Sequence, residues 1–255
     1  HIISAATTSL MNLEKAFSEV GIDIDGVAFN GYSSSLAVLS ETEKELGVVL
    51  VDIGAGTTDI SIYSEGSVAY SSVLPIGARH ITNDLAIGLR IALESAEKIK
   101  IFLSNTSKKP KIERLGETFE KENKNTDEID LSSLGLPEDL RKVSNKTLVD
   151  GIIRPRLNEI FTMIGIEIKR SGFAGQTPAG IVITGGGALT VGITDSAKRT
   201  LAMPVRIGLP TNLKGLIDEI ETPAFATVVG LAKFGATLDI KQSLPFGISL
   251  PDLGN

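Results

Sequence analysis

Apolar and polar positions alternate in recognisable periods through the first part of the chain. An amphipathic pattern predicts a helix over residues 7–20, with one apolar face made of Leu10, Leu13, Phe17 and Val20. A short strand is predicted over residues 26–29, followed by a helix of small residues over 32–39 that ends in the charged stretch ETEKELG. The opening residues, His1-Ile2-Ile3, look like the continuation of a strand.

The next stretch predicts two buried strands and a hairpin. Residues 48–52 form a continuous apolar run, which is typical of a strand buried on both faces. Residues 58–63 alternate, and the sequence SEGS over 64–67 predicts a hairpin turn into a third strand over 68–74. Helical periodicity follows over residues 82–100, with a break expected near Leu93.

The middle of the chain changes in character. Residues 102–137 are crowded with charge and interrupted by Pro110, so we expect a solvated small subdomain or a mobile loop, with short strands there. A long helix is then predicted from Thr147 to just before Gly172, with a kink or a later start at Pro155.

The last third returns to strands and helices. A buried strand, GIVI over residues 180–183, runs into glycines and is followed by a helix, a short strand over 204–207 and a small-residue helix over 223–236. This order of elements predicts a mixed α/β fold in which one subdomain is inserted into another.

Composition narrows the function classes. A net charge of -6 leaves no basic stripe to neutralise phosphates, so we expect no nucleic-acid partner. The absence of cysteine excludes a disulfide framework and thiolate metal sites, and it fits a cytoplasmic protein. The longest apolar runs, such as residues 47–51, are too short to cross a bilayer. Because the chain begins with His1 rather than Met, we interpret it as part of a longer protein.

The first candidate site is the turn DIGAGTT, which runs from Asp52 through Gly54, Ala55, Gly56 and Thr57 to Thr58. Glycine lets backbone N–H groups approach a polyphosphate closely, and threonine hydroxyls add donors. Asp52, at the carboxyl end of a buried strand, could hold a hydrated Mg²⁺ over those phosphates. On this turn alone, a tight structural hairpin is an equal alternative.

A second glycine turn follows the second buried strand, and it contains Gly185, Gly186, Gly187 and Ala188. It could let the backbone lie flat against a nucleobase or its phosphates, because ligands of open α/β sheets bind outside the carboxyl ends of strands. Close packing of a strand against a helix is the alternative.

A charged pair lies on the helix between the two turns. Glu97 and Lys100 are three residues apart, so they share one helix face. The carboxylate could accept hydrogen bonds from ribose hydroxyls while the lysine flanks the base. An exposed surface ion pair is the alternative.

In combination these stretches resemble the actin-like ATPase superfamily. Its second phosphate loop looks like DIGAGTTD, its adenosine motif like ITGGGALTVGI and its ribose-facing helix like SAEKIK. Within the superfamily the chain is similar to the FtsA family of bacterial cell-division proteins. That likeness extends over SSSLAVLSETEKELGVVLVDIGAGTTDISIY, IGARHITNDLAIGLRIALESAEKIK, DEIDLSSLG, IIRPRLNEIF and AGIVITGGGALTVGI.

The resemblance implies an α/β fold of the actin-like (ribonuclease H-like) type. Residues 1–46 would be the end of subdomain 1A, residues 47–101 and 177–239 subdomain 2A, residues 102–176 the inserted subdomain 2B, and residues 240–255 a C-terminal tail. The family's first phosphate loop, its 1C subdomain and its basic membrane-binding helix have no counterpart in these residues, which we therefore interpret as a C-terminal fragment.

The resemblance also implies a function, that of an ATP-binding scaffold at the division site. ATP and Mg²⁺ would be the cofactors, with Asp52 holding the metal through water. In the family, the protein forms filaments on the cytoplasmic face of the inner membrane, binds the FtsZ C-terminal peptide on 2B and recruits later division proteins. We expect Arg154, Arg156 and Lys142 to meet the carboxylates of that peptide, and solvated helix arginines are the equal alternative. Membrane contact is expected to need a segment not present in these residues.

Hydrolysis is expected to be slow at most. In actin-like ATPases the helix start that matches FNGYSSSLAV delivers the hydrolytic residue, and this chain has Asn30 there, which could orient water but is too weak a base to activate it. No acid lies between Asp25 and Glu41, so we assign no catalytic residue. The alternatives are a PilM-like protein of type IV pilus assembly, or an actin-fold ATPase or phosphotransferase.

Overall fold

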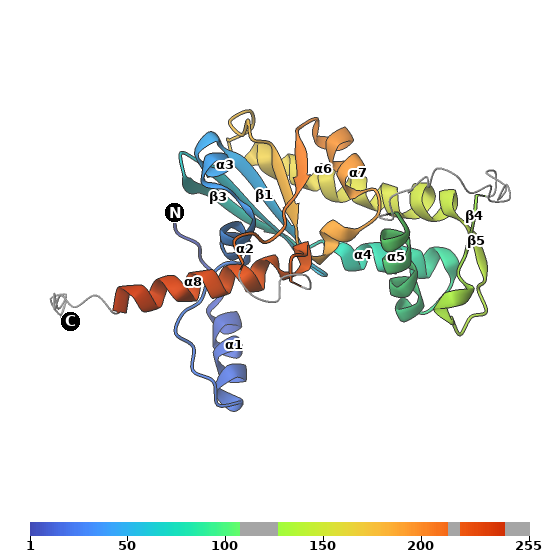
Figure 1. The fold of residues 1–255 in the computed structure, drawn as a ribbon, viewed down its shortest axis with the longest axis horizontal. Helices are drawn as coiled ribbons and strands as arrows, with labels where there is room; N and C mark the ends of the chain where they lie inside the picture. Colours follow the sequence, from blue (N-terminus) through green and yellow to red (C-terminus); the bar gives the residue numbers. More distant parts are fainter. Residues whose placement is uncertain (108–126, 214–219, 243–255) are drawn as a thin grey trace, which may run out of the picture.

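A five-stranded sheet with the strand order β3-β2-β1-β6-β7 lies at the centre of the computed structural model, which describes residues 1–107, 127–213 and 220–242 (Figure 1). The strands are β1 (Val48–Ile53), β2 (Thr58–Ser64), β3 (Ser67–Leu74), β6 (Ile181–Thr184) and β7 (Val205–Ile207). β1 pairs antiparallel with β2 and parallel with β6. Every residue of β1 and β6 is buried, which confirms the two predicted buried strands.

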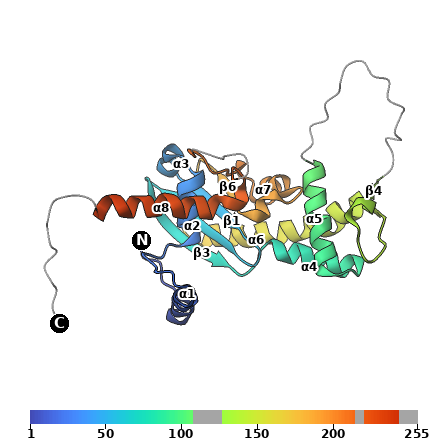
Figure 2. The ribbon, with the colours of Figure 1, turned by 60° about the horizontal axis from the view of Figure 1, so that its bottom comes forward.

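Alternate residues of β1 point to opposite faces of the sheet. Val49, Val51 and Ile53 belong to a core that includes α4 (Ala78–Leu89), α5 (Leu93–Ser107), α6 (Arg154–Arg170) and α7 (Ile193–Leu201). Val48 and Leu50 belong to a second core with α2 (Asn30–Val38) and α8 (Ala226–Gln242), which lie side by side (Figures 1 and 2). The sheet is therefore covered by helices on both faces, as buried strands require.

A small lobe extends beyond the end of the sheet, away from the C-terminal part of α8 (Figure 1). It contains α5, a two-stranded sheet of β4 (Glu128–Asp130) and β5 (Lys142–Ser144), and the short helix η1 (Ser132–Leu134). Of the short strands predicted for residues 102–137, β4 is found in the described part of that stretch, and α5 occupies its start. Residues 108–126 lie outside the described residues.

Pro155 sets the start of the long helix. Residues Thr147–Ile153 form a π-helix, η2, and the α-helix α6 begins at Arg154 with the proline in its first turn. Proline has no N–H to donate and its ring crowds the carbonyl four residues earlier, so it is tolerated at a helix start and not in the interior. The later start that the sequence predicted is confirmed.

Two predicted strands are wrong. Residues 1–3 and 26–29 have no regular structure, because a strand needs a neighbour for its backbone groups and no described strand pairs with them. The predicted N-terminal helix is confirmed as α1 (Thr7–Glu19), which projects from the body of the molecule (Figure 2) and has no buried residue.

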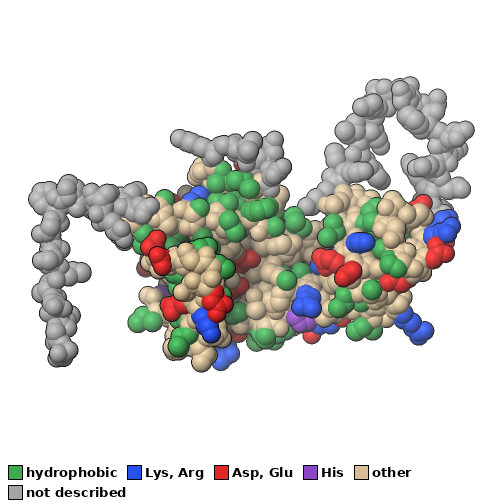
Figure 3. All heavy atoms as spheres, turned by 90° about the horizontal axis from the view of Figure 1, so that it is seen from below, with side chains coloured by type: hydrophobic (Ala, Val, Ile, Leu, Met, Phe, Trp, Pro, Cys, Tyr) green, Lys and Arg blue, Asp and Glu red, His purple; other side chains and the backbone are tan. Residues whose placement is uncertain are grey.

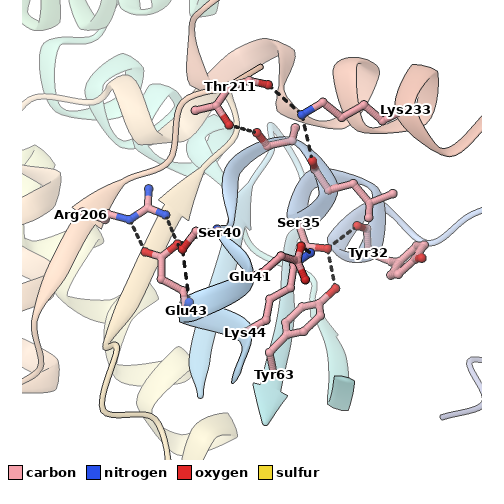
Figure 4. Close-up of polar contacts among 12 residues, drawn as sticks. Tyr32, Ser35, Ser40, Glu41, Glu43, Lys44, Tyr63, Arg206, Thr211 and Lys233 are labelled. Carbon is pink, nitrogen blue, oxygen red and sulfur yellow. Dashed lines mark hydrogen bonds and ion pairs between the residues drawn. The ribbon is translucent and has the colours of Figure 1, made fainter. Parts of the chain in front are cut away.

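The charged stretch ETEKELG forms a further helix, α3 (Glu41–Leu46), which the sequence reading missed. Ser40 and Glu43 make a capping box at its start. Arg206 of β7 donates to Glu43 Oε1 at 2.6 Å and to the Val38 carbonyl at 2.9 Å. Lys233 of α8 donates to the Leu36 carbonyl at 3.1 Å and to the Thr211 carbonyl at 2.8 Å. Figure 4 shows the contacts of Arg206 with Glu43 and of Lys233 with Thr211. These contacts fasten residues 30–46 to the sheet and to α8.

Candidate functional site

The two glycine turns meet at one edge of the sheet. Asp52 pairs with Thr184 at the end of the parallel β1–β6 ladder, so the turn after each strand emerges beside the other. A Cβ on Gly185 would lie 2.3 Å from Asp52 Oδ1, and one on Gly187 would lie 2.4 Å from Ile53 Cγ2. Gly185 and Gly187 are therefore needed for close packing. This agrees with the alternative given above for the second glycine turn, that its glycines serve packing. Gly186 has open space around its Cα and could face a ligand.

The first turn is fastened to the start of α4. The Gly54 N–H donates to the Thr57 carbonyl at 2.9 Å, and the Gly54 and Ala55 carbonyls accept from the N–H groups of Ala78 and Arg79 at 2.9 and 2.8 Å. These bonds fix the turn while Ala55, and with it Gly56, stays exposed. The turn therefore has a rigid backbone with an accessible tip.

Thr57 and Thr58 of this turn differ in what they can do. Thr57 is exposed at the tip. Thr58 is buried, and its hydroxyl donates to the Ile76 carbonyl at 2.7 Å. Its hydroxyl is thus used inside the fold.

A cavity of about 560 Å³ opens between the two turns and the helix α5. It is lined by Gly54, Ala55, Ala78, Arg79, Thr82, Leu93, Glu94, Glu97, Lys100, Ile101, Ser104, Asn105, Gly186, Gly187, Leu189 and Thr190. The three predicted stretches, far apart in sequence, thus share one cavity. Six of the predicted site residues are not among its lining: Asp52, Gly56, Thr57, Thr58, Gly185 and Ala188.

Glu97 and Lys100 form an ion pair of 2.7 Å on the cavity wall. Lys100 is only 9% exposed whereas the Glu97 side chain is 44% exposed, so the pair is half-buried in the cavity wall and differs from a fully exposed surface pair. Its Nζ also donates to Thr82 Oγ1 at 2.9 Å, and the Thr82 hydroxyl donates to Glu97. Burial opposes the charge on Glu97, but the hydrogen bonds from Lys100 and Thr82 outweigh it and lower the pKa of this carboxyl. The pair is therefore a hydrogen-bonded feature of the cavity wall.

Asp52 lies behind the turn in a polar cluster. Its carboxylate accepts from Thr227 Oγ1 at 2.9 Å and from the Ser34 hydroxyl, and burial raises its pKa. Asp59 stands opposite Asp52 in the β1–β2 register. Burial, together with repulsion from Asp52, raises the pKa of Asp59 to about 6, although a hydrogen bond with Asn30 works against the shift.

Asp59 is an acid that the sequence analysis did not assign to the site. It lies beside both Asp52 and Asn30, although no acid lies between Asp25 and Glu41 in the sequence. The signal was available: a hairpin with a four-residue loop at 54–57 places residue 52 opposite residue 59.

The three cations expected to meet a peptide are all held by acids of this chain. Arg156 of α6 forms two bonds to Asp84 of α4, at 2.6 and 2.8 Å. Arg154 pairs with Asp150 at 2.8 Å and Lys142 pairs with Glu128 at 3.5 Å. Arg156 therefore joins two helices, whereas the other two pairs are more exposed and easier to exchange.

The surface carries charges of both signs. On the face shown in Figure 3, the described Lys and Arg side chains are interspersed with Asp and Glu and form no continuous basic stripe. Within the described ranges no helix is long and apolar enough to cross a membrane, and no group of three or more histidine, aspartate and glutamate side chains is arranged to hold a metal ion.

Comparison with known proteins identifies relatives over most of the chain. The family model described as cell division protein FtsA matches residues 49–230. Curated proteins of the same name are 38% identical over 92% of this chain in Pseudomonas aeruginosa, 39% over 94% in Neisseria meningitidis and 33% over 92% in Escherichia coli. The chain spans about half the length of these relatives, 53–55%.

Solved structures confirm the actin-like fold. MreB5 of Spiroplasma citri bound to ADP superimposes with a TM-score of 0.67 at 21% identity, over 94% of this chain and 69% of that one. A PilM–PilN type IV pilus biogenesis complex gives a TM-score of 0.64 at 17% identity, over 91% of this chain and 59% of the other. Identities this low show the fold alone.

Proposed function

Because the chain belongs to the FtsA family of cell division proteins, we propose that it is part of an ATP-binding, actin-like scaffold of bacterial cell division. One observation carries the nucleotide part. The phosphate-loop turn at Gly54 and Ala55, the pair Glu97 and Lys100, and the second turn at residues 186–187 line a single cavity. A phosphate loop, a ribose-facing carboxylate and a base platform are what an adenine nucleotide needs.

The residues fit ATP in size and chemistry. A cavity of about 560 Å³ is within the range of small-molecule sites. Gly186 offers backbone with no side chain above it, and the fold is shared with MreB5 of Spiroplasma citri, which has been crystallised with ADP and with AMPPNP. The exposed tip of the first turn, Gly56 and Thr57, would take part when the phosphates extend beyond the cavity.

Mg²⁺ fits the polar cluster as a hydrated ion. The donors are all oxygens, as a hard cation requires, and two carboxylates, Asp52 and Asp59, stand together. One oxygen of Asp52 already accepts from Ser34 and Thr227. This arrangement supports contact through water and not a closed cage. The ion would neutralise phosphate charge.

Hydrolysis would be slow, and the residues that support it are Asn30 and Asp59. A carboxylate can accept a proton from water, and a hydrogen-bonded amide beside it can orient that water. Both groups lie away from the residues that line the cavity. We therefore assign the protein mainly to nucleotide-dependent assembly, with hydrolysis as a slow secondary activity.

The output of the scaffold would be assembly. By analogy with the family, the protein would form filaments, bind the C-terminal peptide of FtsZ on the predicted subdomain 2B, residues 102–176, and work in the cytoplasm at the inner membrane of the division site. We keep the subdomain limits given above as part of this proposal. A PilM-like role is disfavoured, because the likeness to PilM is one of fold whereas the FtsA relatives match in sequence. A phosphotransferase role has no support from a named relative.

Binding of an FtsZ tail peptide tests the assembly part. The tail is an acidic and apolar peptide, so we expect Arg154→Glu to weaken its binding about tenfold or more, because one charge-assisted contact is lost and a repulsive one is created. Arg156 is a poor first choice for the test, since its loss would also break the contact with Asp84.

Fluorescence anisotropy with a labelled peptide gives the dissociation constant, and Arg141→Glu is a control because Arg141 pairs only with the exposed Asp139 among the described residues. An unchanged dissociation constant for Arg154→Glu would remove this cation from the peptide site. No binding by the unsubstituted protein would contradict the FtsZ link.

A further inference from the structure

Two cations and two acids line the nucleotide cavity, and one ion pair joins two of them. Four charged side chains line it: Arg79, Glu94, Glu97 and Lys100. Lys100 is buried, paired with Glu97 and bonded to Thr82, so its charge is already compensated. A polyphosphate carries several negative charges and needs an uncompensated cation close by. Among the described residues that line the cavity, Arg79 is the cation for which no ion pair is seen.

The position of Arg79 is fixed beside the phosphate-loop turn. Its backbone N–H donates to the Ala55 carbonyl at 2.8 Å, which holds its Cα next to Gly54 and Ala55. It is the second residue of α4, and Thr82, one turn later, lines the same cavity. Its side chain is exposed, so the guanidinium is available to a ligand.

The placement is unfavourable for the helix itself. The start of a helix carries a partial positive charge, and a cation in the first turn is repelled by it. An anion held there is favoured by both the helix end and the guanidinium. Arg79 thus gains its favourable partner when an anion enters the cavity.

We propose that Arg79 binds the polyphosphate of the nucleotide and makes the site selective for nucleoside di- and triphosphates over nucleosides. This inference rests on the proposed nucleotide function. A guanidinium suits the role because its planar N–H groups form two parallel bonds to phosphate oxygens. It would supply, from α4, a cationic contact that the backbone of the glycine turn cannot.

The test is a titration followed by nuclear magnetic resonance, which measures weak as well as tight binding. Residues 1–255 and the variant Arg79→Ala are each titrated with ATP, adenosine and inorganic tripolyphosphate. We expect Arg79→Ala to weaken the binding of ATP and of tripolyphosphate by about tenfold or more, since a charge-assisted contact is lost. The affinity for adenosine should stay unchanged. Arg79→Lys should restore part of the loss, because it returns the charge without the planar fork.

Lys98→Ala is the matched control. Lys98 is an exposed cation on α5, next to Glu97 in sequence, but it does not line the cavity. Lys98→Ala removes one positive charge, as Arg79→Ala does, and should leave the affinity for ATP unchanged. Thermal unfolding of each variant checks that the fold is kept.

Two results would overturn the inference. Equal ATP affinity for Arg79→Ala and the unsubstituted chain would show that the arginine does not contact the phosphates. An equal loss of affinity for ATP and for adenosine would show that Arg79 shapes the cavity instead. If the unsubstituted chain bound neither ATP nor adenosine, the proposed function itself would fail, and the inference with it.

Discussion

Asp52 and Asp59 face each other across the β1–β2 ladder, at the point where both strands reach the phosphate-loop turn. Two buried carboxylates in direct opposition repel each other, and this repulsion adds to burial in raising the pKa of Asp59 to about 6. A hairpin has no structural need for such a pair, because like charges opposite each other destabilise a sheet. The pair is understandable if a cation approaches this end of the sheet.

The first prediction concerns that cation. In a chain that binds Mg-ATP, Asp52→Ala should weaken the binding of Mg-ATP about tenfold or more and the binding of Mg-free ATP much less. A carboxylate that acts on the metal contributes only when the metal is present. Calorimetry with and without Mg²⁺ measures both. Equal losses would give Asp52 a structural role, through its hydrogen bonds with Ser34 and Thr227.

The second prediction separates packing from ligand contact in the glycine turn. Gly187→Ala should lower the free energy of unfolding by about 1–3 kcal/mol, the usual cost of overpacking, because its Cβ would meet Ile53 Cγ2 at 2.4 Å. Gly186→Ala should leave stability nearly unchanged, since nothing lies within 4 Å of its added Cβ, but it should weaken ATP binding. Chemical denaturation and a nucleotide titration measure the two effects. Similar stability of both variants would contradict the packing argument.

The third prediction is a pH dependence of stability that arises at Glu43. Burial opposes its charge, but hydrogen bonds from Arg206 and Ser40 lower its pKa in the folded protein. A lowered folded pKa means that the stabilisation is present above the unfolded pKa and is lost as pH falls through the folded pKa. Glu43→Gln should cost about 1 kcal/mol at neutral pH, and this difference should shrink below about pH 4.3, the unfolded value for glutamate.

Denaturant titrations from neutral to acidic pH check this, with Glu45→Gln as the control. Glu45 lies on the same short helix, is exposed and forms no ion pair with the described residues. Its variant removes a glutamate from the same helix without removing an ion pair, so it should cost less stability at neutral pH than Glu43→Gln. A Glu43→Gln difference that stayed constant with pH would exclude the ion pair with Arg206 as its source.

The fourth prediction follows from the family resemblance, which implies that ATP is gripped by one phosphate loop on each side. Residues 1–255 supply the loop at Gly54–Thr58. Each charge-assisted bond contributes roughly 1.5–3 kcal/mol, so the lack of even a few bonds from an opposing loop weakens binding by several powers of ten. Calorimetry should show weak Mg-ATP binding by residues 1–255 and much tighter binding by a chain extended with the opposing loop. Micromolar binding by residues 1–255 alone would contradict this.

Much of the site could be predicted because its signals are local. A glycine turn directly after an apolar strand marks the carboxyl end of β1 or β6, and parallel pairing of the two strands brings both turns to one edge. Glu97 and Lys100 share a helix face by their spacing alone. The capping box of Ser40 and Glu43 was equally local, and recognition of it would have predicted α3.

The remaining features depend on contacts between distant residues. Burial of Lys100 and the exposure of Arg79 depend on how α4 and α5 pack, and nothing near either residue in sequence indicates it. The strand predicted over residues 26–29 had the right composition but no partner strand in the described structure. Polar partners such as Thr227 for Asp52 are separated by 175 positions and become neighbours only in the folded chain.

The most direct measurement is to map where ATP binds on residues 1–255 by chemical-shift perturbation of backbone amides. We expect the largest perturbations on Gly54, Ala55, Gly186 and Gly187, with smaller ones on the α5 wall at Lys100. Adenosine alone should perturb the second turn and the α5 wall but leave the first turn nearly unchanged. Perturbations centred on the cavity of about 420 Å³ lined by residues such as Phe161, Ile166 and Leu201, or none at saturating ATP, would contradict nucleotide binding between the two glycine turns.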